Sequence, residues 1–165
     1  MINVEAVKRM DEETKYKYMV TLIEGQLSSE SDIYANLANT SAIIYAIMDK
    51  LNWSGFYFIR KNELVLGPFQ GMPACNRIAI GKGVCGTAVS ERKLQRVDDV
   101  HKFPGHIACD SASNSEIVIP IVKDDKVYGV LDIDSYEYGN FTDLKEKYLL
   151  KVMDKLNKYI DWNEL

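Results

Sequence analysis

Cys109 lies in the middle of a stretch that no regular secondary structure explains. Residues 103–120 read F-P-G-H-I-A-C-D-S-A-S-N-S-E-I-V-I-P, and the Pro-Gly pair followed by a polar run predicts a long loop. Loops of this length in a compact domain usually carry function. His106 lies three residues before Cys109, and a nearby histidine favours the reactive thiolate form of a cysteine. Cys109 is therefore the first candidate for a nucleophilic or redox-active thiol.

The other two cysteines, Cys75 and Cys85, follow no redox or zinc spacing. The three thiols are separated as C-x9-C and C-x23-C, so no C-x-x-C pair exists. A free cysteine is most often a small buried hydrophobic residue, and the residues alone favour that interpretation for Cys75 and Cys85. His106 and Cys109 form an H-x-x-C unit that leaves zinc open as an alternative, although structural zinc sites usually combine two closely spaced pairs.

Three acidic residues lie on two strands that we expect to be neighbours. Asp132 and Asp134 are two positions apart in V-L-D-I-D-S, so both side chains leave the same face of a strand, and Glu116 begins the strand I-V-I-P-I-V. A solvated strand end is the favoured interpretation of the two aspartates on the pattern alone. Gathered near a thiol, the three carboxylates would instead raise at least one pKa and provide both a proton donor and a receptor for an ammonium group.

Trp53 and Tyr57 lie on one face of W-S-G-F-Y-F-I-R, which alternates with a period of two. Aromatic residues in such a strand belong to the core by default. As walls of a small apolar pocket they could instead hold a methyl-sulfur group, because sulfur packs well against aromatic rings.

The segment 81–86 reads G-K-G-V-C-G and matches the G-x-G-x-x-G spacing of dinucleotide sites. That fingerprint requires a βαβ unit and an acidic residue about 20 positions later, whereas a very short helix follows here and no parallel sheet is predicted. The glycines rather predict a tight turn into a helix. The free N–H groups of a helix start favour an anion, either a substrate carboxylate or the thiolate of Cys85.

The hydrophobic periodicity predicts an α+β fold with an antiparallel sheet. Gly25 is expected near the end of the first helix, and residues 67–74 are expected to form a loop. Helices are predicted at 4–27, 28–51, 83–91 and 142–162, and strands at 53–60, 63–67, 76–80, 94–98, 117–122 and 127–135.

Length and composition predict one domain over residues 1–165, with a core of about 30–162. The chain has 165 residues, of which 47% are hydrophobic, so it can bury a full core without metals or disulfides. Its net charge of −4, without a basic stripe, argues against nucleic-acid binding. No apolar run reaches membrane-spanning length, and the first 27 residues do not resemble a signal peptide, so we expect a cytoplasmic protein that binds no membrane.

Five motifs together resemble one known family. They are N-W-S-G-F-Y at Asn52, E-L-V-L-G-P-F-Q-G-M-P-A-C at Glu63, G-K-G-V-C-G-T-A at Gly81, D-V-H-K-F-P-G-H-I-A-C-D-S-A-S-N-S-E-I-V-I-P at Asp99, and G-V-L-D-I-D-S at Gly129. They are similar to the motifs of the free methionine-(R)-sulfoxide reductases, a single-domain GAF-fold family, and they extend over essentially all of residues 52–135.

The resemblance implies a GAF-like antiparallel sheet with the N- and C-terminal helices packed on one face, and a homodimer. It also implies reduction of free L-methionine (R)-S-oxide to L-methionine without a bound prosthetic group or metal, with thioredoxin, or dithiothreitol in its place, as the external reductant. The resemblance implies that Cys109 is the nucleophile, that Cys75 is its disulfide partner and that Cys85 is a second relay thiol. It implies that Trp53 and Tyr57 are the aromatic residues of the pocket. It also implies that the acids of the pocket are Glu116, Asp132 and Asp134, of which Glu116 and Asp134 are also catalytic.

The implied chemistry agrees with the residue types. A sulfoxide sulfur becomes electrophilic when its oxygen is protonated or strongly hydrogen-bonded, so a thiolate needs an acid opposite it. The products are methionine and a cysteine sulfenic acid, which condenses with a second thiol to a disulfide that thioredoxin reduces. The alternatives are a GAF-type sensor that binds a small ligand without turnover and a zinc-stabilised interaction module.

Overall fold

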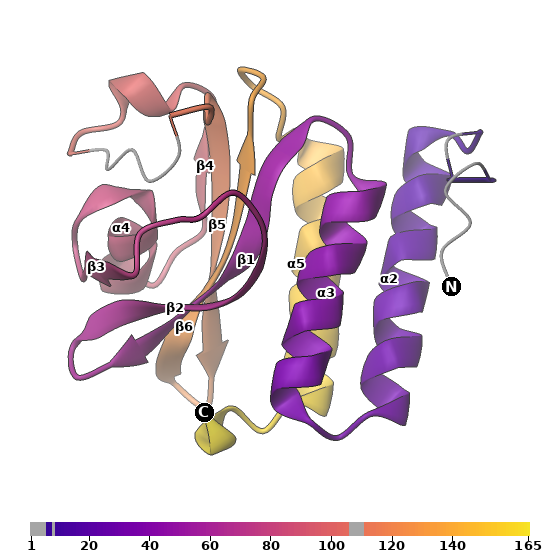
Figure 1. Cartoon of the computed structure of the whole chain (residues 1–165), viewed down its shortest axis with the longest axis horizontal. Helices are drawn as coiled ribbons and strands as arrows, with labels where there is room; N and C mark the ends of the chain where they lie inside the picture. Colours follow the sequence, from indigo (N-terminus) through magenta and orange to yellow (C-terminus); the bar gives the residue numbers. More distant parts are fainter. Residues whose placement is uncertain (1–5, 8, 106–110) are drawn as a thin grey trace.

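The computed structural model describes residues 6–7, 9–105 and 111–165, and it places an antiparallel sheet between helices on both sides (Figure 1). In this part of the chain the sheet has six strands in the order β3-β2-β1-β6-β5-β4, and every neighbouring pair is antiparallel. The strands are β1 (Leu51–Arg60), β2 (Glu63–Gly71), β3 (Arg77–Ala79), β4 (Gln95–Val97), β5 (Ser115–Lys123) and β6 (Lys126–Ser135).

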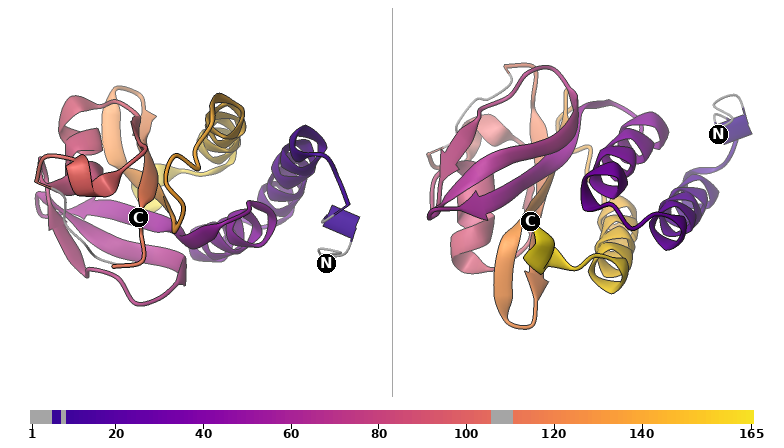
Figure 2. Two further views of the ribbon diagram at one scale, coloured as in Figure 1. Left: turned by 90° about the horizontal axis from the view of Figure 1, so that it is seen from above. Right: turned by 60° about the horizontal axis from the view of Figure 1, so that its bottom comes forward.

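Three long helices cover one face of the sheet. They are α2 (Glu12–Ser29), α3 (Ile33–Ile47) and α5 (Asp143–Tyr159). The sheet contacts α3 and α5, while α2 packs on the outer side of these two helices (Figure 2). In the described part of the chain, no helix combines the length and the apolarity that a membrane crossing requires. The expected α+β architecture, with terminal helices on one face, is confirmed.

Short polar side chains begin these helices. Asp11, Asp32 and Thr142 each accept a hydrogen bond from the backbone N–H three residues later. The opposite face of the sheet carries the short helix α4 (Gly83–Glu91), whose bounds are those predicted. Two 3₁₀ turns complete the chain, η1 (Val100–Lys102) and η2 (Trp162–Glu164).

The alternation of side chains along the central strands divides the interior into two hydrophobic clusters. Phe56 and Phe58 of β1 point toward the helices and join the larger cluster, together with Ile117 of β5. Trp53 and Tyr57 point to the other face and join a smaller cluster under α4. Because successive strand residues leave opposite faces, β1 supplies both clusters at once.

The strands β1 and β2, and likewise β5 and β6, form hairpins, each with a two-residue turn. Lys61 and Asn62 connect β1 to β2, and Asp124 and Asp125 connect β5 to β6, all four with positive φ. Two-residue turns with positive φ at both positions match the twist of antiparallel strands, and Asn and Asp tolerate this conformation better than most residues.

The predicted loop over residues 67–74 is wrong in its first half, because β2 continues to Gly71. The strand passes Pro68 with an irregularity in its pairing, since Gly55 pairs with Phe69 but Tyr57 pairs with Leu66. Only Glu63, Leu64 and Val65 of β2 pair with β3, so Pro68 lies where β2 is an edge strand. A proline lacks an N–H but is tolerated at such an edge or bulge.

The helix boundaries at both ends of the chain also differ from the prediction. The helix predicted from Val4 is interrupted: residues 6 and 7 are helical, a turn follows, and the long helix begins at Glu12 with Asp11 as its cap, while residues 1–5 and 8 lie outside the described part. The last helix ends at Tyr159 rather than near Trp162, which belongs to η2.

Gly25 does not end the first helix, which runs on to Ser29. A buried stripe from Tyr16 to Leu27, which includes Met19 and Ile23, packs this helix on its neighbours. That packing outweighs the helix cost of one glycine, which is about 1 kcal/mol.

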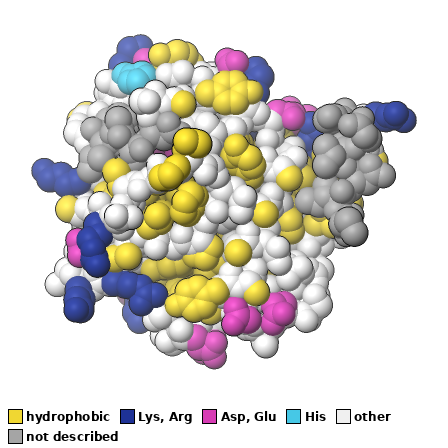
Figure 3. Space-filling model, in the orientation of Figure 1, with side chains coloured by type: hydrophobic (Ala, Val, Ile, Leu, Met, Phe, Trp, Pro, Cys, Tyr) yellow, Lys and Arg dark blue, Asp and Glu magenta, His cyan; other side chains and the backbone are white. Residues whose placement is uncertain are grey.

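Figure 3 shows that hydrophobic side chains are exposed across the middle of one face, while several lysine and arginine side chains gather at its lower left.

We predict that Gly25→Ala stabilises the protein. A Cβ at this position meets no atom within 4 Å, and alanine favours a helix interior over glycine by about 0.5–1 kcal/mol. Urea unfolding followed by circular dichroism should show this gain in the free energy of unfolding. A loss of stability would mean that residue 25 needs a conformation that only glycine adopts.

Candidate active site

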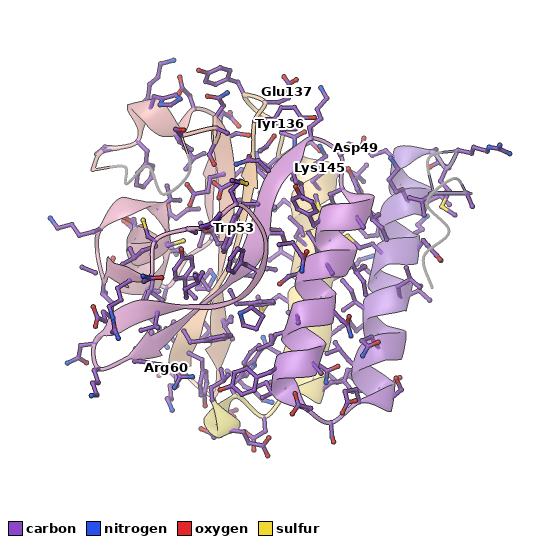
Figure 4. All side chains as sticks on the ribbon, viewed as in Figure 1. Asp49, Trp53, Arg60, Tyr136, Glu137 and Lys145 are labelled. Carbon is purple, nitrogen blue, oxygen red and sulfur yellow. The ribbon has the colours of Figure 1, made fainter. Side chains whose placement is uncertain are left out.

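The candidate site lies on the face of the sheet that the three long helices leave uncovered. On the pairing register, Trp53 of β1 and Glu116 of β5 both lie opposite Asp134 of β6, and Gly55 lies opposite Asp132. Figure 4 shows Trp53 on the α4 side of the sheet, while Lys145 lies among the helices on the other side. Three neighbouring strands therefore bring the predicted aromatic and acidic residues together.

A thiol and two carboxyl groups form a tight cluster at the centre of the site. The ligand atoms of Cys85, Glu116 and Asp132 all lie within 4.8 Å of one another, and all three residues are buried. Cys85 enters from α4, and its Sγ donates a hydrogen bond to Glu116 Oε1 at 3.9 Å. The solvated strand end that the pattern favoured is wrong for Asp132, which is only 6% exposed. Asp134 is half-buried beside it.

Burial raises the pKa of both buried acids. The pKa of Glu116 lies well above its ordinary value because the group is desolvated and because Asp132 and Asp134 repel its charged form. Burial also raises the pKa of Asp132 to about 6. Two carboxyl groups this close cannot both ionise easily, so they hold a proton at neutral pH. The site therefore contains an acid that is able to donate a proton near pH 7.

The surroundings of Cys85 favour its thiol form over the thiolate. Burial raises its pKa well above the ordinary value, and the charges of Asp132 and Glu116 raise it further. It is the third residue of α4, so the helix start was expected to favour its thiolate. That expectation is wrong, because desolvation and two adjacent acids outweigh the partial charge of one helix end.

A stack of three aromatic rings forms the apolar wall of the site. The ring centroid of Trp53 lies 5.8 Å from that of Tyr57 and 5.3 Å from that of Phe69, with interplanar angles of 25° and 14°. Gly55 makes this possible, because a Cβ there would lie 2.4 Å from Cβ of Phe69 and 2.6 Å from the Trp53 ring. Phe69 was not expected here, because residues 67–74 were predicted to form a loop, whereas Phe69 belongs to β2.

Two buried polar atoms at this wall have no hydrogen-bond partner in the described part of the chain. They are Nε1 of Trp53, which is 1% exposed, and Oδ1 of Asp132. A buried unpaired donor and a buried unpaired acceptor are costly in a folded protein. Their presence on the same face of the sheet indicates that the site is built to bind a polar ligand.

Cys75 lies beside the same cluster of residues. The hydroxyl of Tyr57 donates a hydrogen bond of 2.9 Å to the carbonyl oxygen of Cys75, and Cys75 packs against the site cluster. Cys75 is disulfide-bonded, whereas Cys85 is free. The buried, inert thiol that the residues alone favoured is therefore wrong for Cys75. His106 and Cys109 lie outside the described residues, so the role of Cys109 and its pairing with Cys75 stay predictions.

The described ends of the loop that contains Cys109 are attached beside the site residues. Phe103 packs against the site cluster at one end. At the other end Ser113 accepts a hydrogen bond of 2.9 Å from the side chain of Asn52, the residue before Trp53. The next residue, Asn114, bonds to Ser135 O through its N–H. The sequence carried no signal for these contacts beyond the polar composition of the loop.

The fold and the site define a GAF domain. A family model described as GAF domain matches residues 35–155, which include the whole sheet and the residues of the pocket.

Comparison with known proteins narrows the family further. A free methionine-R-sulfoxide reductase of Escherichia coli (strain K12) is 52% identical over 134 residues, which cover 81% of each chain. The solved structure of fRMsr of Staphylococcus aureus in its reduced form is 49% identical, with a TM-score of 0.85, and the match covers 88% of this chain and 95% of that one. A free methionine-R-sulfoxide reductase from Neisseria meningitidis, solved in complex with its substrate, is 40% identical with a TM-score of 0.88, covering 94% and 93%. The chain belongs to the free methionine-R-sulfoxide reductase family, and the resemblance seen in its motifs is confirmed.

We predict that Asp132→Asn stabilises the fold at neutral pH. The pKa of Asp132 rises from 3.8 in the unfolded chain to about 6 in the fold. Below pH 3.8 both states hold the proton and burial of the acid adds no penalty. As the pH rises from 3.8 to about 6 the unfolded state ionises first, so the parent loses stability, at about 1.4 kcal/mol for each unit of pKa.

Urea unfolding of parent and variant between pH 4 and pH 7 checks this expectation. The free energy of unfolding of Asp132→Asn should exceed that of the parent at pH 7, and the difference should shrink toward pH 4. The exposed residue Asp154 on α5 provides the control, since Asp154→Asn changes the net charge equally. A less stable Asp132→Asn at pH 7 would contradict the burial penalty.

Proposed function

We propose that this protein reduces free methionine-R-sulfoxide to methionine. The observation that carries the proposal is the buried acid cluster, which holds a proton at neutral pH beside an aromatic wall and two redox-capable cysteines. Membership in the reductase family supports it, as do the two solved relatives described above.

The pocket offers a place for each part of the free amino acid. The methyl-sulfur end packs against the rings of Trp53 and Tyr57, since sulfur is attracted to aromatic rings. The α-ammonium group pairs with Asp132 or Asp134, and Oδ1 of Asp132 is unpaired and buried. A peptide bond would remove that ammonium charge and leave the acids without a partner, which a polar site rejects strongly.

The acid cluster supplies the proton that the reaction needs. Glu116 donates a proton to the sulfoxide oxygen, which makes the sulfur electrophilic enough for a cysteine thiolate. Attack transfers the oxygen from the substrate to the cysteine, so the products are methionine and a cysteine sulfenic acid. The sulfenic acid then condenses with a second thiol, releasing one water and forming a disulfide.

The burial of Cys85 supports Cys109 as the nucleophile. A thiol whose pKa is raised by burial and two acids is a poor thiolate source. Cys109 is four residues from Ser113 in the sequence, and four residues span at most about 14 Å, so chain length allows it to reach the pocket. Cys75 lies at the pocket edge and is the expected disulfide partner, and Cys85 hydrogen-bonds the catalytic acid.

A thioredoxin is the proposed reductant of the resulting disulfide. Met72 and Ile80, which flank Cys75 in the sequence, are 67% and 38% exposed. They offer an apolar surface beside a redox-active cysteine, where thiol exchange requires access. A homodimer and a cytoplasmic location are further parts of this proposal and come from the family resemblance.

Turnover of free and blocked substrates tests the function. With dithiothreitol as reductant, free methionine-R-sulfoxide should yield methionine. N-acetyl-methionine-R-sulfoxide and the free S epimer should react at least about a hundredfold more slowly, because each leaves a polar group of the site unpaired or misplaced. Equal rates for free and acetylated substrate would contradict the recognition argument. Tight binding of the free sulfoxide without any methionine release would favour a sensor.

The order of the thiols is tested by single-turnover experiments without reductant. Cys109→Ser should release no methionine, even with excess dithiothreitol. Cys75→Ser should release one equivalent and then depend on a small-molecule thiol. Cys85→Ser should keep the single-turnover burst, because a hydroxyl can still donate to Glu116. A full burst from Cys109→Ser together with none from Cys85→Ser would reverse the assignment.

A further inference from the structure

The cluster of Cys85, Glu116 and Asp132 has the composition and spacing of a metal site. We propose that, with Cys85 in its thiol form, the cluster binds one thiophilic divalent cation, Zn²⁺ or Cd²⁺, through these three residues. The cation acts as a reversible inhibitor and not as a cofactor. The binding itself depends only on the cluster, and the inhibition rests on the proposed function.

The distances suit an ion of this kind. The three ligand atoms lie within 4.8 Å of one another, and Cys85 Sγ lies 3.9 Å from Glu116 Oε1. Zinc bonds of about 2.3 Å to sulfur and about 2.0 Å to oxygen, in tetrahedral geometry, place the two ligand atoms about 3.5 Å apart. Cys85 Sγ and Glu116 Oε1 therefore need to approach by only a few tenths of an ångström, Asp132 supplies the third ligand atom within 4.8 Å of both, and a water or ligand atom completes the coordination.

The charge of the cluster and its unpaired carboxylate oxygen also favour a cation. Within the described residues, no lysine or arginine forms an ion pair with Glu116 or Asp132. Oδ1 of Asp132, in a side chain that is 94% buried, has no hydrogen-bond partner there either. Buried anionic groups need a proton or a cation for compensation. An unpaired carboxylate oxygen beside a thiol provides a ready position for a cation.

The mixed donor set selects the type of cation. Ca²⁺ and Mg²⁺ prefer sites built from oxygen alone, whereas a cysteine sulfur favours Zn²⁺ and Cd²⁺. Binding replaces the thiol proton and any carboxyl proton that the cluster holds, so protons are released and no electron transfer occurs. Because Asp132 would also receive the substrate ammonium, the cation and the free amino acid exclude one another.

The experiment uses the full chain with Cys85 as its single thiol, made by Cys75→Ser and Cys109→Ser. The protein, kept reduced by a phosphine that does not complex the metal as dithiols do, is titrated with Cd²⁺ and followed by the ultraviolet thiolate-to-cadmium charge-transfer band. We expect saturation at one equivalent. Free methionine, which is redox-inert, should weaken the binding in proportion to its concentration.

Variants in the same background identify the ligands. Cys85→Ser should abolish the charge-transfer band. Glu116→Gln and Asp132→Asn should each weaken Cd²⁺ binding by at least about tenfold, which is the lower end of the loss seen even for groups outside the coordination shell. Asp154→Asn, an exposed change of equal charge on α5, should leave the affinity unchanged. Circular dichroism and thermal unfolding confirm that each variant is folded.

Two results would overturn the proposal. One is a single-thiol protein that shows no charge-transfer band. The other is a band whose affinity is unchanged in folded Glu116→Gln and Asp132→Asn, which would place the metal on Cys85 alone. Neither result depends on turnover, so the metal site can fail while the reductase assay succeeds, and the reverse.

Discussion

The burial of two carboxyl groups against each other is the constraint on which the site depends. Glu116 and Asp132 lie on adjacent strands beside the thiol of Cys85 and a third acid, Asp134, and desolvation raises the pKa of both. Isolated in water, either group would be ionised at neutral pH and could not donate a proton. Inside the domain they share protons, which turns ordinary acidic residues into an acid of useful strength.

The rest of the fold compensates for the loss of stability that these buried acids cause. Buried acids of raised pKa weaken a folded protein at neutral pH, and here the second face of the same sheet compensates with a large apolar core under α3 and α5. The two faces are coupled through β1, β5 and β6, which contribute side chains to both. The larger apolar cluster therefore lies on the helix side, and the buried acids lie on the other side.

Elements that are distant in sequence supply the parts of the pocket. The acids come from β5 and β6, the aromatic wall from β1 and β2, and the thiol from α4. The start of a helix by itself would favour the nucleophilic thiolate of Cys85. Burial and two neighbouring acids instead make the Cys85 thiol a hydrogen-bond donor. Its properties depend on its neighbours rather than on its own helix.

The sequence by itself determined the type and order of most elements, because their apolar periodicity, their caps and their turn residues are local properties. It also predicted the acids, the aromatics and the cysteines as site residues, because their motifs resemble one family. Only the tertiary structure decided that Asp132 is buried, that β2 continues through Pro68 to carry Phe69, and that Cys85 faces Glu116. Each of these depends on strand pairing or on contacts between distant segments, and burial and pKa follow from such contacts rather than from any pattern along the chain.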